Sequence, residues 1–400
     1  MKCKLEYVWL DGYAPEPNLR SKVKIVDYEE IKNCLVLNNF PEGNFDGSST
    51  KQAQTGNSDC ILKPVRHYFC DHNNIIYVLC EVLNSDGTPH ESNHRSKLGD
   101  EDSNLWFGFE QEYFIQKGIG EGFLGHDRKF VEPQGKYYCG VGSNVVGREF
   151  VEKHTNLCLR YDIDITGTNA EVALGQWEYQ VFSKGKLNAG DDLWMSRYFL
   201  YKISEEYGYD IILHPKPIQY GEWNGSGLHA NFSNERMRDY GNEEYFRAIF
   251  TSFENRHQEH IKAYGSDNNL RLTGNFETQS IDKFSWGISD RGASIRVPKA
   301  TAEKWRGYLE DRRPGSNADP YKIIKEITLS LDGIKYWEQM YKSINVKIDV
   351  NDIEGKYGTL TTDELLKEYS DDFENDLSEN LMESVGNVPK EEIKFELNNK

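Results

Sequence analysis

Residues 105–114 read Leu-Trp-Phe-Gly-Phe-Glu-Gln-Glu-Tyr-Phe and predict a β-strand that follows a polar, turn-like segment at 99–104. Successive side chains of a strand point to opposite faces, so Glu110 and Glu112 are expected on the same face. Two carboxylates on one face among aromatic residues are electrostatically costly unless a cation lies between them. The stretch therefore predicts a cation site, although an exposed strand with a solvated acidic face would show the same pattern.

Strand and helix patterns interleave on both sides of this stretch. A strand is predicted at 75–83, because an apolar, β-branched run ends there at turn-forming residues. Helices are expected at 191–207 with a stop at Gly208, at 243–264 with a stop at Gly265, and from Pro320 on with Asp319 as the N-cap. No strand pattern is followed by G-x-G-x-x-G or by a Walker-type lysine loop, so neither a Rossmann nor a P-loop fold is indicated.

Composition narrows the function classes. The chain carries 47 basic and 65 acidic side chains, and its formal net charge of −18 repels the phosphate backbone of nucleic acids. No apolar run approaches the roughly 20 residues of a membrane-spanning helix, and the first residues show no signal-peptide pattern. The seven cysteines are scattered without a C-x-x-C pair, which favours reduced thiols over a zinc cluster or a disulfide framework. We therefore expect a cytoplasmic protein without nucleic-acid or membrane partners.

Other acidic, imidazole and guanidinium groups lie in short segments with apolar, small or glycine neighbours. They are Glu171, Glu178 and His229, followed by the arginines Arg271, Arg291, Arg296, Arg312 and Arg313. Asn231 and Ser233 would share a strand face with His229. Each of them alone is as readily a surface group or a salt-bridge partner. Together, carboxylates and one imidazole suit a hard divalent cation, and arginines suit phosphate or carboxylate groups. The residues alone predict metal-assisted phosphoryl transfer to or from a small anionic substrate.

In these same segments the chain resembles the type II (eukaryotic-type) glutamine synthetases, over about residues 5–345 and in consistent order. The matching motifs are Asn44–Thr50, Glu110–Tyr113, Asn169–Val172, Gln176–Glu178, Asn224–His229 and Glu310–Pro314. The resemblance implies an α+β fold with a small N-terminal β-grasp domain (1–98) and a larger catalytic domain of curved antiparallel strands with flanking helices (99–345). It also implies a homo-oligomer of two stacked rings, a decamer, whose active sites lie between neighbouring subunits.

The resemblance further implies ATP as co-substrate and two or more Mg²⁺ or Mn²⁺ ions in each site. Carried over by motif, the first metal would be held beside the glutamate substrate by Glu112, Glu171 and Glu178. The second would be held beside the nucleotide phosphates by Glu110, His229 and Glu310.

Substrate contacts are carried over in the same way. The residues that would bind the amino-acid substrate, its carboxylates or the transferred phosphate are Asn224, Gly225, Arg271, Arg291 and Arg312. Those that would lie at ATP are Glu110, Asn231, Ser233, Arg291 and Arg296.

The implied reaction is the ligation of ammonia to L-glutamate through γ-glutamyl phosphate, giving glutamine, ADP and phosphate. Arg291 would stabilise the transferred phosphate, and Asp46 would take a proton from ammonium. Glu277 would be the glutamate of a flap that closes the site against water. Asn275 and Phe276 precede it where an aromatic residue followed by histidine is expected, so this sequence leaves the packing of the flap open.

Two alternative functions remain open at this stage. One is a ligase that joins glutamate to another amine, and the other is a non-catalytic family member with a structural role. The chain also continues past the resemblance as an acidic extension at 346–400. Its apolar residues recur at helical spacing after a capping-box pattern, which predicts an amphipathic helix at 363–384.

Overall fold

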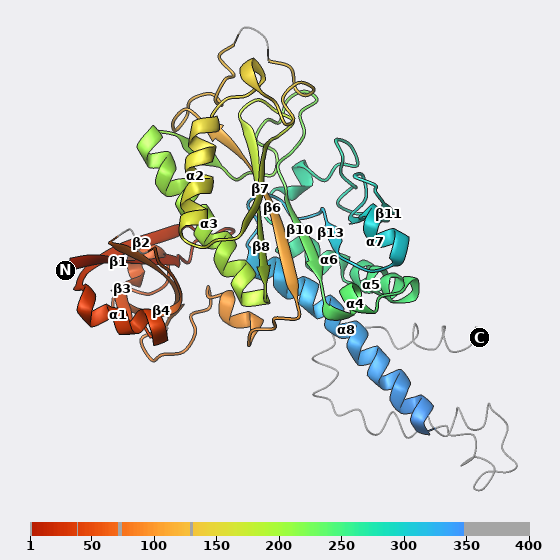
Figure 1. Cartoon of the computed structure of the whole chain (residues 1–400), viewed down its shortest axis with the longest axis horizontal. Coiled ribbons are helices and arrows are strands. Elements are labelled where there is room, and N and C mark those ends of the chain that lie inside the picture. The colour runs from red at the N-terminus through yellow and green to blue at the C-terminus, as the bar shows by residue number, and fades with distance from the viewer. Residues whose placement is uncertain (1, 38, 71–73, 129–130, 348–400) are drawn as a thin grey trace, which may run out of the picture. The chain divides into compact units, whose positions relative to one another are not determined.

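The computed structural model describes residues 2–37, 39–70, 74–128 and 131–347 (Figure 1). Residues up to Thr328 form one compact unit, and the described residues from Leu329 on belong to a second. The predicted domain boundaries near residues 98 and 345 stay predictions, and the helix predicted at 363–384 lies outside the described residues. Within the described ranges, no helix combines the length and apolar character needed to cross a membrane.

The N-terminal part of the first unit is a five-stranded sheet with one helix. Its strands are β1 (Lys2–Leu10), β2 (Leu19–Asp27), β3 (Gly43–Asp46), β4 (Asp59–Tyr68) and β5 (Ile75–Leu83), and α1 (Tyr28–Leu37) joins β2 to β3. The strand order is β2-β1-β5-β4-β3, and every neighbouring pair is antiparallel except β1–β5. Leu5, Leu62 and Val78 are fully buried in its core. The strand predicted at 75–83 is confirmed as β5, and Asp46 ends the edge strand β3.

A larger, eight-stranded sheet follows. Its strands are β6 (Trp106–Gln116), β7 (Ile165–Ala170), β8 (Gln176–Lys184), β9 (Asp210–Ile212), β10 (Leu228–Ser233), β11 (Trp286–Ile288), β12 (Ile295–Val297) and β13 (Leu309–Asp311). The order is β11-β12-β13-β10-β6-β8-β7, with β9 beside the end of β6. The expected antiparallel arrangement holds at each pair except β11–β12, which is parallel, so the sheet is mixed.

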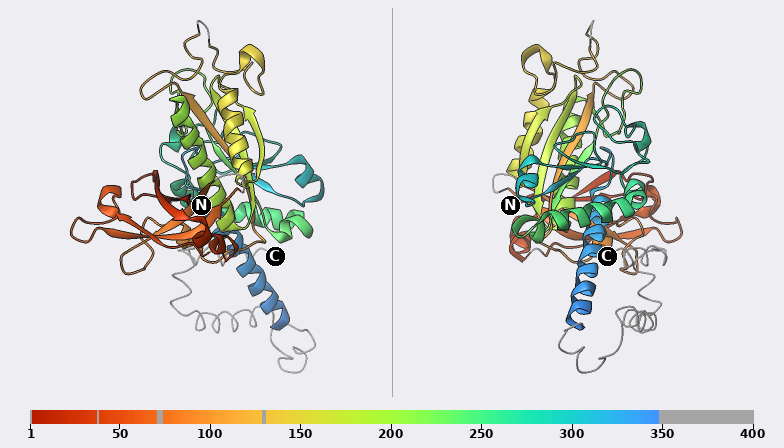
Figure 2. Two further views of the ribbon diagram at one scale, coloured as in Figure 1. Left: turned by 60° about the vertical axis from the view of Figure 1, so that its left-hand side comes forward. Right: turned by 90° about the vertical axis from the view of Figure 1, so that its right-hand side faces the viewer.

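Helices flank this sheet. The α-helices are α2 (Arg148–Arg160), α3 (Lys186–Tyr207), α4 (Glu235–Asp239), α5 (Glu243–Asn255), α6 (His257–Ala263), α7 (Lys299–Lys304) and α8 (Pro320–Lys347). Short 3₁₀ helices lie at Gly47–Thr50, Arg95–Leu98, Gly142–Asn144 and Asn268–Leu270. α2 and α3 pack side by side, α3 against β6 and β8 and α2 against β7 (Figures 1 and 2).

The helix predictions are confirmed in two of three places. α3 ends at Gly208, whose φ of 64° is the left-handed conformation that glycine adopts readily at a helix C-terminus. The single helix predicted at 243–264 is wrong, because the chain breaks at Arg256 into α5 and α6. The break turns His257 and His260 toward Arg313, whose guanidinium lies 2.9 and 2.7 Å from their Nδ1 atoms. A tertiary contact therefore overrides the helical pattern.

The third prediction, Asp319 as the N-cap before Pro320, is also confirmed. The Asp319 carboxylate accepts a hydrogen bond from the backbone N–H of Tyr321 at 3.0 Å and lies 2.6 Å from Nδ1 of His94. Burial opposes the ionisation of this carboxyl, but the contact with His94 outweighs it and lowers the pKa of Asp319.

We expect Asp319→Ala to reduce the free energy of unfolding by about 2 kcal/mol, because it removes a helix cap and leaves His94 without its partner. Asp319→Asn keeps an oxygen that accepts from the backbone of Tyr321, so it should cost less. Urea denaturation at neutral pH compares the two variants. Equal losses would show that the charge, and not the cap, carries the effect.

Candidate active site

The register of four strands gathers five of the six predicted ligands on one face of the larger sheet, and the sixth, Glu171, directly follows β7. Glu110 of β6 pairs with His229 of β10, and Glu112 of β6 pairs with Glu178 of β8. Glu310 of β13 pairs with Asn231 of β10. Directly opposed residues of antiparallel strands project from the same face. The prediction that Glu110 and Glu112 share a face therefore extends to side chains that are far apart in the sequence.

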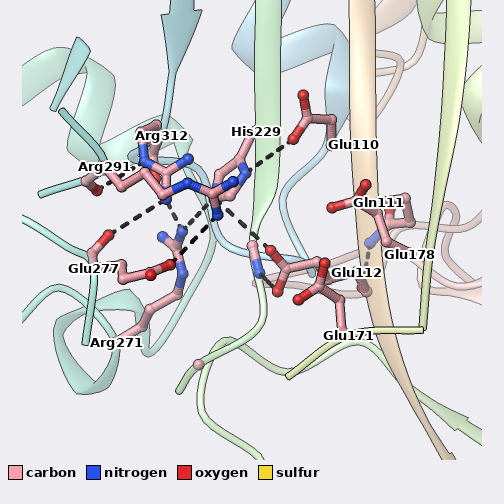
Figure 3. A network of polar contacts seen from close by, with 12 residues as sticks. Glu110, Gln111, Glu112, Glu171, Glu178, His229, Arg271, Glu277, Arg291 and Arg312 are labelled. Carbon is pink, nitrogen blue, oxygen red and sulfur yellow. Dashed lines mark hydrogen bonds and ion pairs between the residues drawn. The ribbon is translucent and has the colours of Figure 1, made fainter. Parts of the chain in front are cut away.

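The tightest cluster consists of Glu110, His229 and Glu310. Figure 3 shows the contact between Glu110 and His229. One ligand atom from each residue lies within 4.8 Å of the other two. His229 Nδ1 is 3.3 Å from a Glu110 oxygen and 3.6 Å from a Glu310 oxygen. Burial, followed by the charge of Arg312, holds the pKa of His229 well below its usual range. A neutral imidazole between two carboxylates is a donor set that fits a hard divalent cation.

Three further carboxylates, those of Glu112, Glu171 and Glu178, lie beside this cluster. Burial and the neighbouring carboxylates raise the pKa of Glu171 to about 8 and that of Glu178 to about 9. Burial raises the pKa of Glu112 to about 7, although Arg271 lies near enough to oppose the shift. The raised pKa values favour the protonated carboxyl groups when no cation is present, and a bound cation would displace these protons. Within the described ranges, however, only Glu110, His229 and Glu310 meet the 4.8 Å spacing, so this group is more open.

Amide groups orient these three carboxylates. The backbone N–H of Gly227 and the Gln176 side chain each donate to Glu112 Oε2 at 3.0 Å. Asn169 donates to Glu171 at 2.9 Å, and Gln180 donates to Glu178 at 2.9 Å. The side chains are therefore held in place by the protein itself.

We expect Glu178→Gln to stabilise the metal-free protein increasingly as pH rises. The folded-state pKa of Glu178 is raised to about 9. Its contribution to stability is therefore fully present below the ordinary carboxyl pKa and is lost as pH rises through about 9. Denaturation with EDTA present should show the variant more stable than the wild type by at least about 1 kcal/mol at alkaline pH, with little difference at a pH near or below the ordinary carboxyl pKa. A difference that does not grow with pH would contradict this electrostatic account.

Arginines border the cluster on its other side (Figure 3). Arg296 and Arg312 each donate to one oxygen of Glu310 at 2.6 Å. Arg271 lies 3.1 Å from His229 Nε2 and donates to the carbonyl of Arg312 at 2.9 Å. Burial lowers the pKa of Arg271 to about 10. The site thus places buried guanidinium groups against the carboxylates, which suits an anionic ligand shared between them and a cation.

A loop approaches the arginines from the segment before β10. A side chain at Gly225 would place its Cβ 2.5 Å from the Pro215 carbonyl and 2.6 Å from Arg271 Cγ, so only glycine fits there. Asn224 accepts a hydrogen bond from Gln134. Gly225 therefore lies beside Arg271, and Asn224 precedes it in the same loop.

The segment around Glu277 lies over the same arginines. Glu277 Oε2 is 3.7 Å from Arg291 Nη1, and both side chains are about half exposed, at 50% and 55%. Arg312 donates to the Glu277 carbonyl at 3.5 Å. Glu277 and Phe276 both have positive φ angles, 60° and 54°, which are strained for residues other than glycine. The expected flap glutamate is thus brought to the expected phosphate-binding arginine.

Three further expected site residues, Asp46, Asn231 and Ser233, have surroundings that differ from one another. Asp46 is exposed, and its carboxylate accepts hydrogen bonds from the Ser48 backbone at 2.9 Å and hydroxyl at 2.6 Å, which lower its pKa. Within the described part of this single chain, Asp46 is not brought together with the carboxylate cluster. Ser233 is buried and accepts from Arg238 at 3.1 Å, whereas Asn231 donates to Glu110 at 2.8 Å.

Three residues at the site were not predicted. Gln176 orients Glu112, Tyr138 forms a hydrogen bond with Arg291, and Tyr308 lies near the carboxylates of the cluster. Burial, and then the charges of Glu110 and Glu310, raise the pKa of Tyr308. Gln176 lies in the quoted motif Gln176–Glu178, but no role was assigned to it. Neither tyrosine has a signal in the sequence, because each reaches the site through a loop.

Two family models match the chain. The family model described as "Glutamine synthetase, beta-Grasp domain" matches residues 1–85, and the one described as "Glutamine synthetase, catalytic domain" matches residues 92–242. A glutamine synthetase of Bradyrhizobium diazoefficiens is 50% identical over 341 residues, which cover 83% of this chain and 97% of that protein. One of Saccharomyces cerevisiae is 45% identical over 327 residues, covering 80% of this chain and 86% of that protein.

A solved structure shows the same fold. The cryo-EM structure of Plasmodium falciparum glutamine synthetase superposes with a TM-score of 0.64 and 17% identity, covering 84% of this chain and 72% of that chain. The five-stranded sheet with its helix corresponds to the β-grasp match, as expected from the sequence.

Proposed function

Because the chain belongs to the glutamine synthetase family, we propose that the face formed by β6, β8, β10 and β13 is its active site. The chain is an ATP-dependent glutamate–ammonia ligase, which forms glutamine, ADP and phosphate. The observation that supports this site best is the cluster of Glu110, His229 and Glu310 within 4.8 Å, flanked by Arg296 and Arg312.

The residues of this face fit divalent metals. Glu110, His229 and Glu310 would hold one ion, and Glu112, Glu171 and Glu178 would hold another once it displaces their protons. Magnesium and manganese suit a set dominated by carboxylate oxygens. When bound, such ions neutralise the charge of the ATP phosphates and polarise the phosphoryl group that is transferred.

The arginines support the chemistry of phosphoryl transfer. Ammonia cannot replace an oxygen of a carboxylate directly, because oxide would have to leave. Transfer of the γ-phosphoryl group of ATP to the γ-carboxylate of glutamate gives γ-glutamyl phosphate, from which ammonia then displaces phosphate. Arg291 and Arg296 would stabilise negative charge on the transferred group, while Arg271, Arg312 and the Asn224-Gly225 loop would hold glutamate. Asn231 and Ser233 would lie toward the nucleotide.

Binding of ammonium requires anionic groups, and its reaction with the acyl phosphate requires a site from which water is excluded. Glu277, held near Arg291, would close the site, and Asp46 would attract ammonium and accept its proton. We place Asp46 at the cluster of a neighbouring subunit, in a decamer of two stacked rings of the type II family. The exposure of Asp46 and its position on a separate sheet support this arrangement. The seven free cysteines support a cytoplasmic location.

One coupled assay tests the proposed function. Purified protein with ATP, glutamate and either Mg²⁺ or Mn²⁺ should form glutamine in proportion to phosphate release, and only when ammonium is present. Methylamine, putrescine and spermidine in place of ammonium test the alternative of another amine. Faster turnover with any of these amines, or no turnover at all, would overturn the assignment.

A further inference from the structure

Lys216 occupies an unusual position for a lysine. It is only 8% exposed, and burial lowers its pKa. Within the described ranges no carboxylate forms an ion pair with it. Its ammonium group instead donates to the Trp223 carbonyl and lies 4.6 Å from the centroid of the Phe276 ring. A cation that has left water this far is stabilised by an aromatic face and a carbonyl, and loses that stabilisation if either moves away.

Each of these two partners directly precedes a residue of the proposed site. Trp223 precedes Asn224 in the substrate loop, and Phe276 precedes Glu277 in the flap. The substrate loop is also fixed from another direction, because Trp223 stacks on His126 at 5.3 Å and Gln134 donates to the Glu222 carbonyl at 3.0 Å. Lys216 therefore links the flap to a loop that is already anchored.

The flap requires such a link. Phe276 and Glu277 both have positive φ angles, so the conformation that directs Glu277 toward Arg291 is strained. Strained residues keep their conformation only when contacts around them hold it. For Phe276, the contact with Lys216 supplies this restraint, and it uses the aromatic side chain that stands where histidine was expected.

We propose that Lys216 is a positioning residue that fastens Phe276 of the flap to the Trp223-Asn224 loop, so that Glu277 closes the site in register with bound glutamate. This inference rests on the proposed function. It adds a residue, Lys216, that helps the closed flap to retain ammonium. Loss of the contact would lower the population of the closed flap, which weakens the apparent binding of ammonium and admits water to the acyl phosphate.

The test compares Lys216→Met, Lys216→Arg, Phe276→Leu and the double variant Lys216→Met/Phe276→Leu. Lys153→Met is the matched control, because Lys153 also lies over an aromatic ring, that of Tyr207, but is an exposed residue of α2, away from the site. Initial rates are measured against ammonium at saturating ATP and glutamate, with glutamine and phosphate quantified together. Hydrogen exchange of amides 274–280 is followed without substrates.

Lys216→Met and Phe276→Leu should each raise the KM for ammonium about 3- to 10-fold, with kcat changed less than about 2-fold. Phosphate release should exceed glutamine formation in both, and their flap amides should exchange faster. The double variant should resemble the single ones, and Lys216→Arg and Lys153→Met should resemble the wild type.

Multiplied effects in the double variant, or unchanged KM and product ratio in both single variants, would overturn the proposal. If Lys216→Met does not fold, Phe276→Leu alone tests the proposal. It must still show a raised KM for ammonium and more phosphate released than glutamine formed. If the wild type forms no glutamine, the proposed function fails independently. Hydrogen exchange of the flap amides then tests only whether Lys216 restrains the flap. Equal exchange in the wild type and both single variants would refute that restraint.

Discussion

Replacing Glu112 with glutamine should reduce turnover by about 10²- to 10³-fold, because a lost metal ligand removes several kcal/mol of transition-state stabilisation. The metal-free variant should nevertheless unfold at a temperature no lower than the wild type. Burial and the nearby Glu110 charge oppose the ionisation of Glu112. Glutamine removes that charge and keeps an oxygen that accepts from Gly227 and Gln176. Function and stability should therefore separate at this position.

The measurement pairs steady-state turnover at saturating Mg²⁺ with thermal unfolding in EDTA and in Mg²⁺. In the wild type Mg²⁺ should raise the melting temperature, and Glu112→Gln should lose part of this rise, because ligand binding stabilises only the folded state that binds it. Glu152→Gln, on the exposed side of α2, is the control for losing one acidic charge. Near-normal turnover of Glu112→Gln would remove Glu112 from the metal site, and a melting temperature well below the wild type would make its role structural.

The sequence predicts which side chains share a face of one strand better than it predicts which strands pair with each other. Strand alternation was sufficient to place Glu110 and Glu112 on one face, because the period of a strand depends only on the backbone. The pairing of β6 with β10, and of β10 with β13, depends on contacts between distant segments. The motifs that resemble a known family therefore supplied the grouping of Glu110, His229 and Glu310, which local pattern alone left as separate candidates.

Tertiary contacts account for the sequence predictions that were wrong or incomplete. The helical pattern at 243–264 is real, but the contacts of His257 and His260 with Arg313 end α5 at Asn255. Phe276 and Glu277 adopt left-handed conformations without the glycine or asparagine that would signal them. Local sequence propensity predicts neither feature. In both places, contacts with the surrounding structure offset the free-energy cost of a conformation that the local sequence disfavours.

Co-assembly of Asp46→Asn chains with Glu112→Gln chains should restore activity that neither variant has alone. If each site takes Asp46 from one subunit and Glu112 from its neighbour, random mixing of equal amounts makes about a quarter of the sites intact. The structure motivates this expectation, because Asp46 is exposed at the end of β3 and accepts hydrogen bonds from Ser48 in the adjoining turn. The carboxylate cluster lies on the other sheet.

The matched control is a mixture of Glu112→Gln with Glu310→Gln chains. Glu112 and Glu310 both lie close to His229 of one chain, at 3.9 and 3.6 Å, so every site in that mixture carries a defect and no activity should return. Native mass measurement must show mixed oligomers in both experiments. Recovery only in the mixture with Asp46→Asn would show that Asp46 acts across a subunit boundary. Mixed oligomers without recovery would instead require Asp46 to reach the cluster of its own chain, and then the exposed conformation around Ser48 would have to change when substrates bind.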